Sequence, residues 1–464
     1  MSRLGLRPIE KAAYAFGGIV DIFGHWFYFG LMQPVFVGFL HLSPSLLGVA
    51  QAASHLTGAF TDSYFGWRSD NTRTRWGRRR PYVLVGSVFA GALLPCLFAA
   101  SRTWSASTLF WFVLLTACGF APILSCYNMP YQSLGAELTP DTDERTTVMS
   151  WRGVVQTLVG VANAWAWWFA ARPWFADAGT PNLARGAMWA GGVVGGLMIL
   201  AGLGSALVVR ERYYPIARQQ DRTGFGAMTR QALRCHPFRI LLLALILFAV
   251  PTSLVGALSW YVLYYHVLAG SQGTAALYGG LAGTAYSVAG AACIPFAVWL
   301  ARKVGKGRAL QWSLCGGSVA LAASYVLYTP AAPILSAVCH GLFGMVTSGF
   351  FWVLLPSMLA DVIDFDELES GKRREGAYAS ILSFVLKLGT TFILLLTGPL
   401  IELTGFDAHK AAQSPSTVLA LRLLFAVVPA TAALLAALVL RRYPLNRATM
   451  NTIRARLEAK RGAV

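Results

Sequence analysis

The sequence predicts an all-α membrane protein with twelve transmembrane helices in two pseudo-symmetric bundles of six. Three observations carry this prediction. First, 56% of the 464 residues are hydrophobic and only 12% are charged, whereas about a quarter of the residues of a soluble protein are charged. Second, apolar segments of about 20 residues, each long enough to cross a bilayer core of about 30 Å, recur along the chain. Third, connectors of similar chemistry occur at matching places in the two halves.

The apolar segments define the expected helices in order. The first six form an N-terminal bundle over residues 1–209, and the last six form a C-terminal bundle over residues 238–442. A polar, arginine-rich cytoplasmic linker, residues 210–237, joins them, and residues 443–464 form a basic cytoplasmic tail. We expect no cleavable signal peptide, because charged residues lead directly into a full-length span. The helices are expected to be centred near Phe27, Leu56, Ala90, Leu115, Ala162, Val194, Phe248, Val288, Ala320, Val346, Ile393 and Ala430.

The net charge of +18 indicates how the chain is oriented in a membrane and does not indicate a nucleic-acid partner. Basic residues gather in the connectors after the even-numbered spans, at 68–80, 210–239 and 302–308, and in both tails. The opposite connectors, such as HLSPS and YTPAAP, are short and nearly uncharged. By the positive-inside rule, both termini are expected in the cytoplasm, with the protein in a bacterial-type cytoplasmic (inner) membrane.

Several classes of function are not supported. The seven cysteines are scattered without a CxxC pair, so neither a disulfide framework nor a metal site is indicated. No glycine-rich phosphate loop of the Walker type is present, and this gives ATP-driven pumping no support. No connector is long enough to be a catalytic domain. We therefore expect no enzyme, no catalytic residue, no metal and no cofactor, and a monomer whose partners are membrane lipids and a small molecule.

The two halves carry related connectors. The first is PYQSLGAELTPDTDERTTVMSWRG, from Pro130, and the second is PSMLADVIDFDELESGKRREGAYASI, from Pro356. Each has a proline at the end of a span, then an acidic cluster, then basic residues. A fainter echo links RTRWGRRRP after the second span to ARKVGKGRAL after the eighth. Paired six-span repeats are typical of transporters that bind their substrate between the halves near the membrane midplane.

These motifs carry a family resemblance. The stretch GWRSDNTRTRWGRRRP resembles the cytoplasmic signature of the major facilitator superfamily, in the form found in the glycoside–pentoside–hexuronide:cation symporters, the group of the melibiose permease. The sequences PYQSLGAELTPDTDERT and DVIDFDELESGKRREG resemble two other signatures of that group. The three occur in the expected order. The resemblance implies alternating access, with a charged cytoplasmic gate formed by Gly66, Asp70, Arg75, Gly77, Arg78, Arg79, Asp361, Asp364, Arg373 and Arg374.

Charged residues inside the expected spans need a function or a partner. A charge near the centre of a transmembrane helix costs about 2.5–3.5 kcal/mol on insertion scales. The candidates are Asp21, Asp62, Arg152 and Lys387, with Asn128 as an uncharged companion. Opposite charges on different helices can share one hydrated cavity, or they can form structural ion pairs that fix helix packing.

The resemblance suggests a cation site. It implies cation coupling by Asp62, just before GWRSD, and by Lys387, at the start of KLGTTFILLLTGPLIELTGF. Two carboxylates of the family pattern are replaced, by Gly58 and Asn128. A sodium ion needs about six oxygen ligands, by analogy with other hard cations. A proton needs one titratable carboxylate, so we favour protons over sodium as the coupling ion.

The resemblance also suggests a sugar site. It implies an acid, an arginine and an aromatic platform at Asp21, Arg152 and Trp352, to which Ser383 could add a hydroxyl contact. Gln132 replaces an aromatic residue of the family, which argues for a substrate other than melibiose. The full set expected to bind substrate is Asp21, Asn128, Gln132, Arg152, Trp352 and Ser383. His25 lies one helical turn from Asp21, on the same face.

The sequence therefore predicts a symporter that moves a sugar or glycoside, coupled to a cation. Two other functions stay open. A branch of the same family carries lysolipids, and a further possibility is a sensor that keeps the fold without transporting. The polar residues expected in the cavity favour a polar substrate over an acyl chain. The retained gate and Lys387 argue against a sensor.

Overall fold

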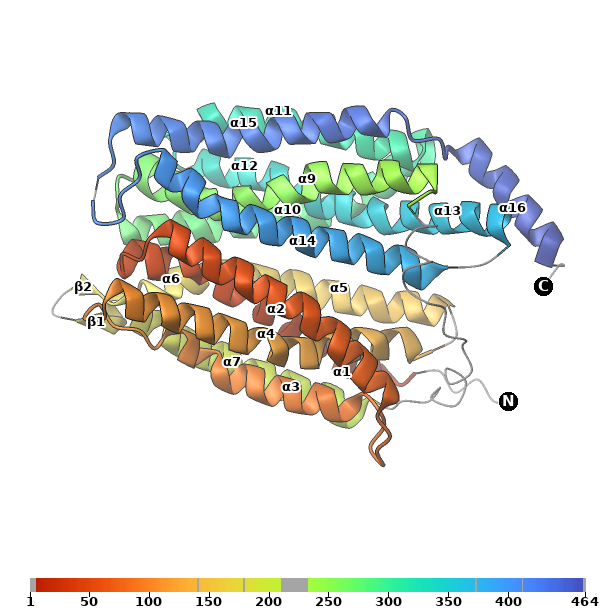
Figure 1. The fold of residues 1–464 in the computed structure, drawn as a ribbon, viewed down its shortest axis with the longest axis horizontal. Coiled ribbons are helices and arrows are strands. Elements are labelled where there is room, and N and C mark those ends of the chain that lie inside the picture. The colour runs from red at the N-terminus through yellow and green to blue at the C-terminus, as the bar shows by residue number, and fades with distance from the viewer. Residues whose placement is uncertain are drawn as a thin grey trace. The chain divides into compact units, whose positions relative to one another are not determined.

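The computed structural model describes residues 6–139, 142–177, 180–209, 233–371, 374–410 and 412–461. Within these ranges the protein is built almost entirely of long helices (Figure 1). A helical segment occurs at each predicted centre, and the predicted fold class is confirmed. The segments of the first half are α1 (Pro8–Met32) with its π-helical extension η1 (Gln33–Phe39), α2 (Pro44–Asn71), α3 (Arg80–Leu93) with η2 (Pro95–Phe98), α4 (Ala106–Glu137), α5 (Thr142–Ala164) with α6 (Ala166–Ala170), and α7 (Leu183–Val208).

The second half repeats this pattern of long helices. Its tenth span is one continuous rod made of α12, η6 and α13. The segments are α9 (His236–Tyr261) with η5 (Val262–Val267), α10 (Gln272–Val304), α11 (Lys306–Leu327), α12 (Ile334–Gly344), η6 (Met345–Phe351), α13 (Trp352–Ser370), α14 (Glu375–Leu403) and α15 (Pro415–Leu440), followed by a surface helix, α16 (Arg447–Arg461). The linker predicted at 210–237 falls mostly outside the described residues.

Length and composition identify the spans. Among the described residues, 9 helical segments are long and apolar enough to cross a membrane. The helices α1, α2 and α5 are not among the 9, and each of them contains one of the charged residues Asp21, Asp62 and Arg152. Three of the four charged residues that the sequence singles out within spans thus lie on helices that depart from a purely apolar composition.

Local sequence explains where several helices begin and end. The side chains of Ser43, Ser105 and Ser414 accept hydrogen bonds from backbone N–H groups in the first turns of α2, α4 and α15. A side-chain oxygen at this position satisfies an N–H group that the helix itself leaves without a partner. At the end of α13, Gly371 adopts a left-handed conformation, with φ of 71°, which costs glycine little because it has no Cβ.

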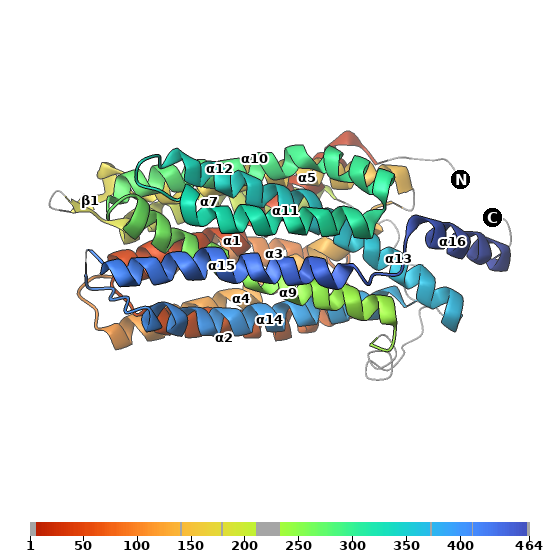
Figure 2. The ribbon, with the colours of Figure 1, turned by 90° about the horizontal axis from the view of Figure 1, so that it is seen from above.

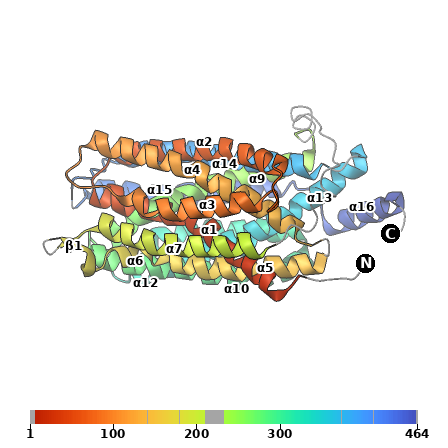
Figure 3. The same cartoon turned by 90° about the horizontal axis from the view of Figure 1, so that it is seen from below.

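The chain divides into two compact units. The first comprises Met1–Gln220 together with Gly270–Thr284 and Leu394–Gln413, and the second comprises the rest. In the first unit, α7 packs against α1 and α3, and α4 packs against α2 and α3 (Figure 3). In the second unit, α15 packs in the same way against α9 and α11 (Figure 2). The sixth helix of each half thus contacts the first and third helices of its own half, as expected for a structural repeat.

Glycines let α3 and α7 approach each other closely. A Cβ on Gly195 would lie 2.1 Å from the carbonyl oxygen of Gly91, and a Cβ on Gly91 would lie 2.3 Å from the carbonyl oxygen of Gly195. Small residues at helix contacts are a general means of packing helices in membranes. Neither contact can be relieved by moving a side chain, because both neighbours are backbone atoms.

Gly195→Ala should therefore lower the melting temperature of the purified protein. We expect a loss of about 1–3 kcal/mol, typical of overpacking. The matched control is Gly196→Ala on the same helix, where a Cβ meets nothing within 4 Å. This substitution should leave the melting temperature unchanged or raise it slightly, because alanine has the higher helix propensity. Equal melting temperatures for the two variants in a thiol-reactive dye assay would contradict the packing described here.

Late segments of the chain join the first unit at the end opposite the basic loop of residues 72–79. The carboxylate of Glu402 accepts hydrogen bonds from the hydroxyl of Ser43, from the backbone N–H of Ser45 at 3.2 Å and from the Ser45 hydroxyl at 2.5 Å. Trp165 donates its indole N–H to Oγ1 of Thr284 at 3.0 Å. The C-terminal end of α14 is thus tied to the start of α2, and α10 is tied to the end of α5.

A small hairpin lies in the connector between α6 and α7. Strands β1 (Ala176–Asp177) and β2 (Thr180–Pro181) pair antiparallel, after the short 3-10 helix η3 (Pro173–Phe175). Asn182 and Arg185 each contact the Asp177 carboxylate at 2.5 Å. The hydrogen bond from Asn182, together with the charge of Arg185, lowers the pKa of Asp177. The exposed ion pair of Arg185 and Asp177 serves as a control for the buried ion pair of Arg152 and Asp21.

Candidate functional site

The candidate site is built around an ion pair between α1 and α5. The guanidinium of Arg152 donates a hydrogen bond to Oδ2 of Asp21 at 2.8 Å, and the side-chain amide of Gln156 donates to the same oxygen at 3.0 Å. Arg152 and Gln156 are four residues apart, so they lie on one face of α5. The side chains of Arg152 and Asp21 are 18% and 13% exposed. The predicted proximity of Asp21 and Arg152 is thus present in the structure.

Two further polar residues extend the cluster. Nδ1 of His25 lies 3.0 Å from the backbone oxygen of Asp21 and 3.7 Å from its Oδ1. The side-chain amide of Asn128, on α4, lies 3.4 Å from the same imidazole nitrogen. Asn128 is 2% exposed. The cluster therefore draws residues from α1, α4 and α5, and His25 lies on the Asp21 face as its spacing predicts.

Stacked tyrosines form one wall of the site. The ring of Tyr131 stacks on Tyr14 at 4.8 Å and on Tyr127 at 5.2 Å between centroids, and the guanidinium of Arg152 lies 5.2 Å from the Tyr131 centroid. The Tyr131 and Tyr127 hydroxyls donate to the backbone oxygens of Tyr14 at 2.7 Å and of Gly17 at 2.8 Å. These bonds fix the rings between α1 and α4.

Glycine at position 17 makes room for this wall. A Cβ there would lie 2.4 Å from Cε2 of Tyr131 and 2.9 Å from the Tyr127 hydroxyl. Any larger residue would displace the tyrosine rings and, through Tyr131, the contact with Arg152. The glycine is thus explained by close approach of the aromatic rings to α1.

The cluster retains hydrogen-bonding capacity. Among the described residues, Oδ1 of Asn128 and Nε of Arg152 are buried atoms without a hydrogen-bond partner. Buried polar atoms are nearly always paired, so unpaired ones in a polar cluster need an explanation. An acceptor on Asn128 and a donor on Arg152 are suited to a ligand that carries several hydroxyl groups, since a hydroxyl can both donate and accept.

The other predicted site residues of the first unit are Gln132 and Asp62. Gln132 is exposed on α4, and it is its neighbour Tyr131 that contacts Arg152. Asp62 is half-buried on α2. The preceding residue, Thr61, shares a hydrogen bond of 2.8 Å with the Ser125 hydroxyl of α4. These placements leave the roles of Gln132 and Asp62 as predictions.

The remaining predicted site residues belong to the second unit. Trp352 begins α13 and is 44% exposed. On α14, Ser383 is exposed and Lys387 is half-buried. Their roles in substrate binding and cation coupling stay predictions.

The predicted gate residues of the first unit form an ion-pair cluster. Asp70, at the end of α2, accepts a hydrogen bond from Arg79 at 3.0 Å, and Nη1 of Arg78 lies 4.0 Å from the same carboxylate oxygen. Gly77 turns the loop with φ of 108°, in the region that favours glycine. Arg75 is exposed, and Gly66 is part of α2. The basic loop is therefore held to the end of α2.

The second unit has a related cluster. Nζ of Lys306, at the start of α11, lies 2.6 Å from Oδ2 of Asp361 and donates to the backbone oxygen of Ser357 at 3.1 Å. Arg374 lies 3.5 Å from Asp366. Lys306 is not among the predicted gate residues, although it belongs to the ARKVGKGRAL echo. Asp364 is half-buried, and Arg373 lies outside the described residues.

Comparison with known proteins identifies the family. Residues 9–447 match the family described as MFS/sugar transport protein. The chain belongs to this family. It is the branch of the major facilitator superfamily that contains the melibiose-permease-like glycoside–cation symporters, as the motifs predict. The protein is therefore an integral membrane protein of a transporter family and not an enzyme.

The similarity to individual relatives extends over most of the chain. The inner membrane symporter YicJ of Escherichia coli (strain K12) is 26% identical, over 83% of this chain and 80% of its own length. The glucuronide carrier protein homolog of the same organism is 26% identical, over 84% of this chain and 82% of its own length. The sphingosine-1-phosphate transporter MFSD2B of Xenopus tropicalis is 25% identical, over 96% of this chain and 89% of its own length.

A solved structure shares the major facilitator fold. The crystal structure of a D-xylose-proton symporter aligns with a TM-score of 0.63 at 14% identity, covering 94% of this chain and 97% of its own length. At this identity the likeness concerns the fold alone. It agrees with the arrangement of long helices described above.

Proposed function

We propose that the protein is a secondary active symporter that carries a sugar or glycoside across the cytoplasmic membrane by alternating access, coupled to a cation. The observation that carries this proposal is the Asp21–Arg152–Gln156 cluster, with the unpartnered Oδ1 of Asn128 beside it. A carboxylate and a guanidinium can each bind several hydroxyl groups at once, through strong charge-assisted hydrogen bonds. A sugar presents hydroxyl groups at the spacing that such a cluster can bind.

We assign substrate binding to Asp21, Asn128, Gln132, Arg152, Trp352 and Ser383. In this proposal the first-unit cluster holds the hydroxyl groups, and the indole of Trp352 covers the apolar face of the sugar ring. A small number of polar groups within largely apolar walls is the usual composition of a small-molecule site. The names of sugar-carrying relatives support the same class of substrate.

We assign cation coupling to Asp62 and Lys387, with protons favoured over sodium. The sequence has Gly58 and Asn128 where the family pattern has two further carboxylates. Without those carboxylates a sodium ion would lack oxygen ligands, whereas a single carboxylate suffices for a proton. The Asp70–Arg79 and Lys306–Asp361 pairs are proposed to act as the cytoplasmic gate, with both termini in the cytoplasm by the positive-inside rule.

A second candidate function is transport of a lysolipid or another amphiphile. It is favoured by one observation, the 25% identity to a relative named as a sphingosine-1-phosphate transporter. The charged cluster between α1 and α5 could then bind a phosphate group. The two candidates differ in the rest of the ligand, which is a sugar in one case and an acyl chain in the other.

A ligand screen on the purified protein distinguishes these candidates. Thermal shifts are measured with a panel of mono- and disaccharides, glycosides and lysophospholipids, because a ligand that binds only the folded state raises the melting temperature. We expect a shift with at least one sugar or glycoside, and none when Arg152 is replaced. A shift with lysophospholipids alone, lost on replacement of Arg152, would overturn the sugar proposal in favour of the amphiphile.

A further inference from the structure

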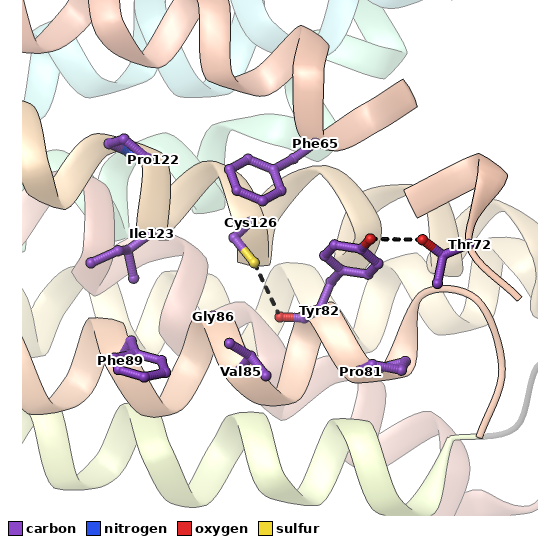
Figure 4. A pocket seen from close by; sticks show the side chains of 10 residues that line it. All are labelled: Phe65, Thr72, Pro81, Tyr82, Val85, Gly86, Phe89, Pro122, Ile123 and Cys126. Carbon is purple, nitrogen blue, oxygen red and sulfur yellow. Dashed lines mark hydrogen bonds between the residues drawn. The ribbon is translucent and has the colours of Figure 1, made fainter. Parts of the chain in front are cut away.

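An apolar groove lies between α2, α3 and α4, away from the candidate sugar site. Its volume is about 470 Å³, and it includes none of the residues of the Asp21–Arg152 cluster. Figure 4 shows Val85 and Phe89 on α3, Ile123 and Pro122 on α4, and Phe65 on α2, all around one hollow. A volume of this size lies within the range of small-molecule sites, about 300–1,000 Å³.

The groove opens on the outer surface of the first unit. Val85 is 48% exposed and Phe89 is 56% exposed. They are four residues apart on α3, so they lie on one face of that helix. In a helix that crosses the membrane, exposed apolar side chains face lipid hydrocarbon. The groove is thus accessible to lipid acyl chains without passage through the substrate site.

One end of the groove is polar. There the hydroxyl groups of Thr72 and Tyr82 lie 2.7 Å apart, and Figure 4 shows this pair at the edge of the hollow. The Thr72 hydroxyl also donates to the backbone oxygen of Arg68 at 2.8 Å. Arg68 follows Phe65 by three residues and precedes Thr72 by four, so it lies on the groove side of α2. The apolar groove therefore ends next to an arginine.

The surroundings of this end are basic and rich in tryptophan. Arg68, Arg73 and Arg75 are exposed, and so are the indoles of Trp67 and Trp76. The single carboxylate of the loop region, Asp70, contacts Arg79 at 3.0 Å. Tryptophan is enriched where hydrocarbon meets headgroups, and basic residues at a membrane surface attract anionic lipids. This end of the groove has the composition of a headgroup site.

We propose that the groove binds one anionic glycerophospholipid, with an acyl chain between α2, α3 and α4 and its phosphate at Arg68. An arginine suits this role because its planar guanidinium can bind two phosphate oxygens at once. Arg73 and Arg75 add attraction for the negative charge. A sugar would find polar partners at one end of the groove only, so the groove is suited to a lipid and not to the transported solute.

Native mass spectrometry of the full-length protein tests the proposal with two pairs of variants. Micelles contain phosphatidylglycerol and phosphatidylcholine with identical acyl chains. Val85→Trp fills the groove, and Val193→Trp places the same side chain at an exposed position of α7. Arg68→Gln removes the proposed phosphate ligand, and Arg441→Gln removes an exposed arginine after α15.

The wild type and both controls should retain one phosphatidylglycerol in preference to phosphatidylcholine. Val85→Trp should lose this lipid. Arg68→Gln should keep a lipid but lose about fivefold of the headgroup preference, which corresponds to about 1 kcal/mol, the usual contribution of one basic residue at a membrane surface. Equal lipid retention by Val85→Trp and Val193→Trp, or an unchanged preference in Arg68→Gln, would overturn the proposal.

A measurement on the wild type avoids any effect of substitutions on folding. Phosphatidylglycerol with a photoreactive diazirine in the middle of one acyl chain is crosslinked to the protein, and the modified peptides are sequenced. Crosslinks should concentrate on residues 85–89 of α3 and 122–126 of α4. Crosslinks spread evenly over the exposed faces of α3, α4 and α7 would show that lipid there is not bound at a defined site.

Discussion

Arg152→Gln should abolish substrate binding and transport. A hydrogen bond from a ligand to a charged group contributes about 1.5–3 kcal/mol, so loss of the guanidinium should lower the affinity for substrate about 10-fold or more. Arg152 is placed for this role by its 2.8 Å contact with Asp21 and by its unpartnered Nε. Binding is measured by thermal shift with the ligand found in the screen, and transport by uptake into proteoliposomes.

Two variants separate a binding role from a structural one. Arg185→Gln breaks the exposed ion pair with Asp177 and should leave transport unchanged, because exposed pairs contribute only about 0–1 kcal/mol. The double variant Asp21→Asn with Arg152→Gln leaves no unpaired buried charge, so its melting temperature should recover relative to Arg152→Gln. Its transport should not recover. Restored transport in the double variant would show that the pair serves helix packing and does not bind substrate.

Asp62→Asn should eliminate uphill accumulation of substrate while leaving downhill exchange. Accumulation requires a group that takes up a cation on one side of the membrane and releases it on the other. Asparagine has nearly the shape of aspartate but cannot titrate. Because Gly58 and Asn128 replace the other carboxylates of the family pattern, no second acid of that pattern is present to take over.

The measurement for Asp62 uses proteoliposomes under an imposed proton gradient, with exchange of labelled for unlabelled substrate in the same vesicles. Asp177→Asn, at an exposed position in the hairpin, is the matched control and should accumulate substrate like the wild type. Accumulation by Asp62→Asn at the wild-type level would refute the coupling role. Loss of exchange as well as accumulation would show that Asp62 binds substrate or holds the fold.

Much of the fold could be predicted because the membrane restricts it. Apolar segments of spanning length have few alternatives to a helix, since every backbone polar group must be satisfied within the segment. The charges at Asp21 and Arg152 stood out for the same reason, and their contact is present in the structure. The i, i+4 spacing of Asp21 and His25 predicted a shared face, which the 3.7 Å contact confirms.

Other residues of the site and of the gate have only weak signals in the sequence. Gln156 contacts Asp21, and its only signal is the one-turn spacing from Arg152. Tyr131 lies three residues from Asn128, and its neighbour Gln132 was chosen from the family pattern instead. The Lys306–Asp361 and Ser45–Glu402 contacts join residues far apart in the sequence, so no local pattern could have paired them.

The central claim is that a cation gradient drives a sugar or glycoside through this protein. It is tested most directly with purified wild-type protein in proteoliposomes, by uptake of the labelled sugar that gives the largest thermal shift, at fixed membrane potential. An inward proton gradient should accumulate the sugar above its external concentration, and a protonophore should abolish the accumulation. Accumulation driven only by sodium would show that the coupling ion is wrong. No accumulation under either gradient, with transport of lysophospholipid in the same vesicles, would contradict the account.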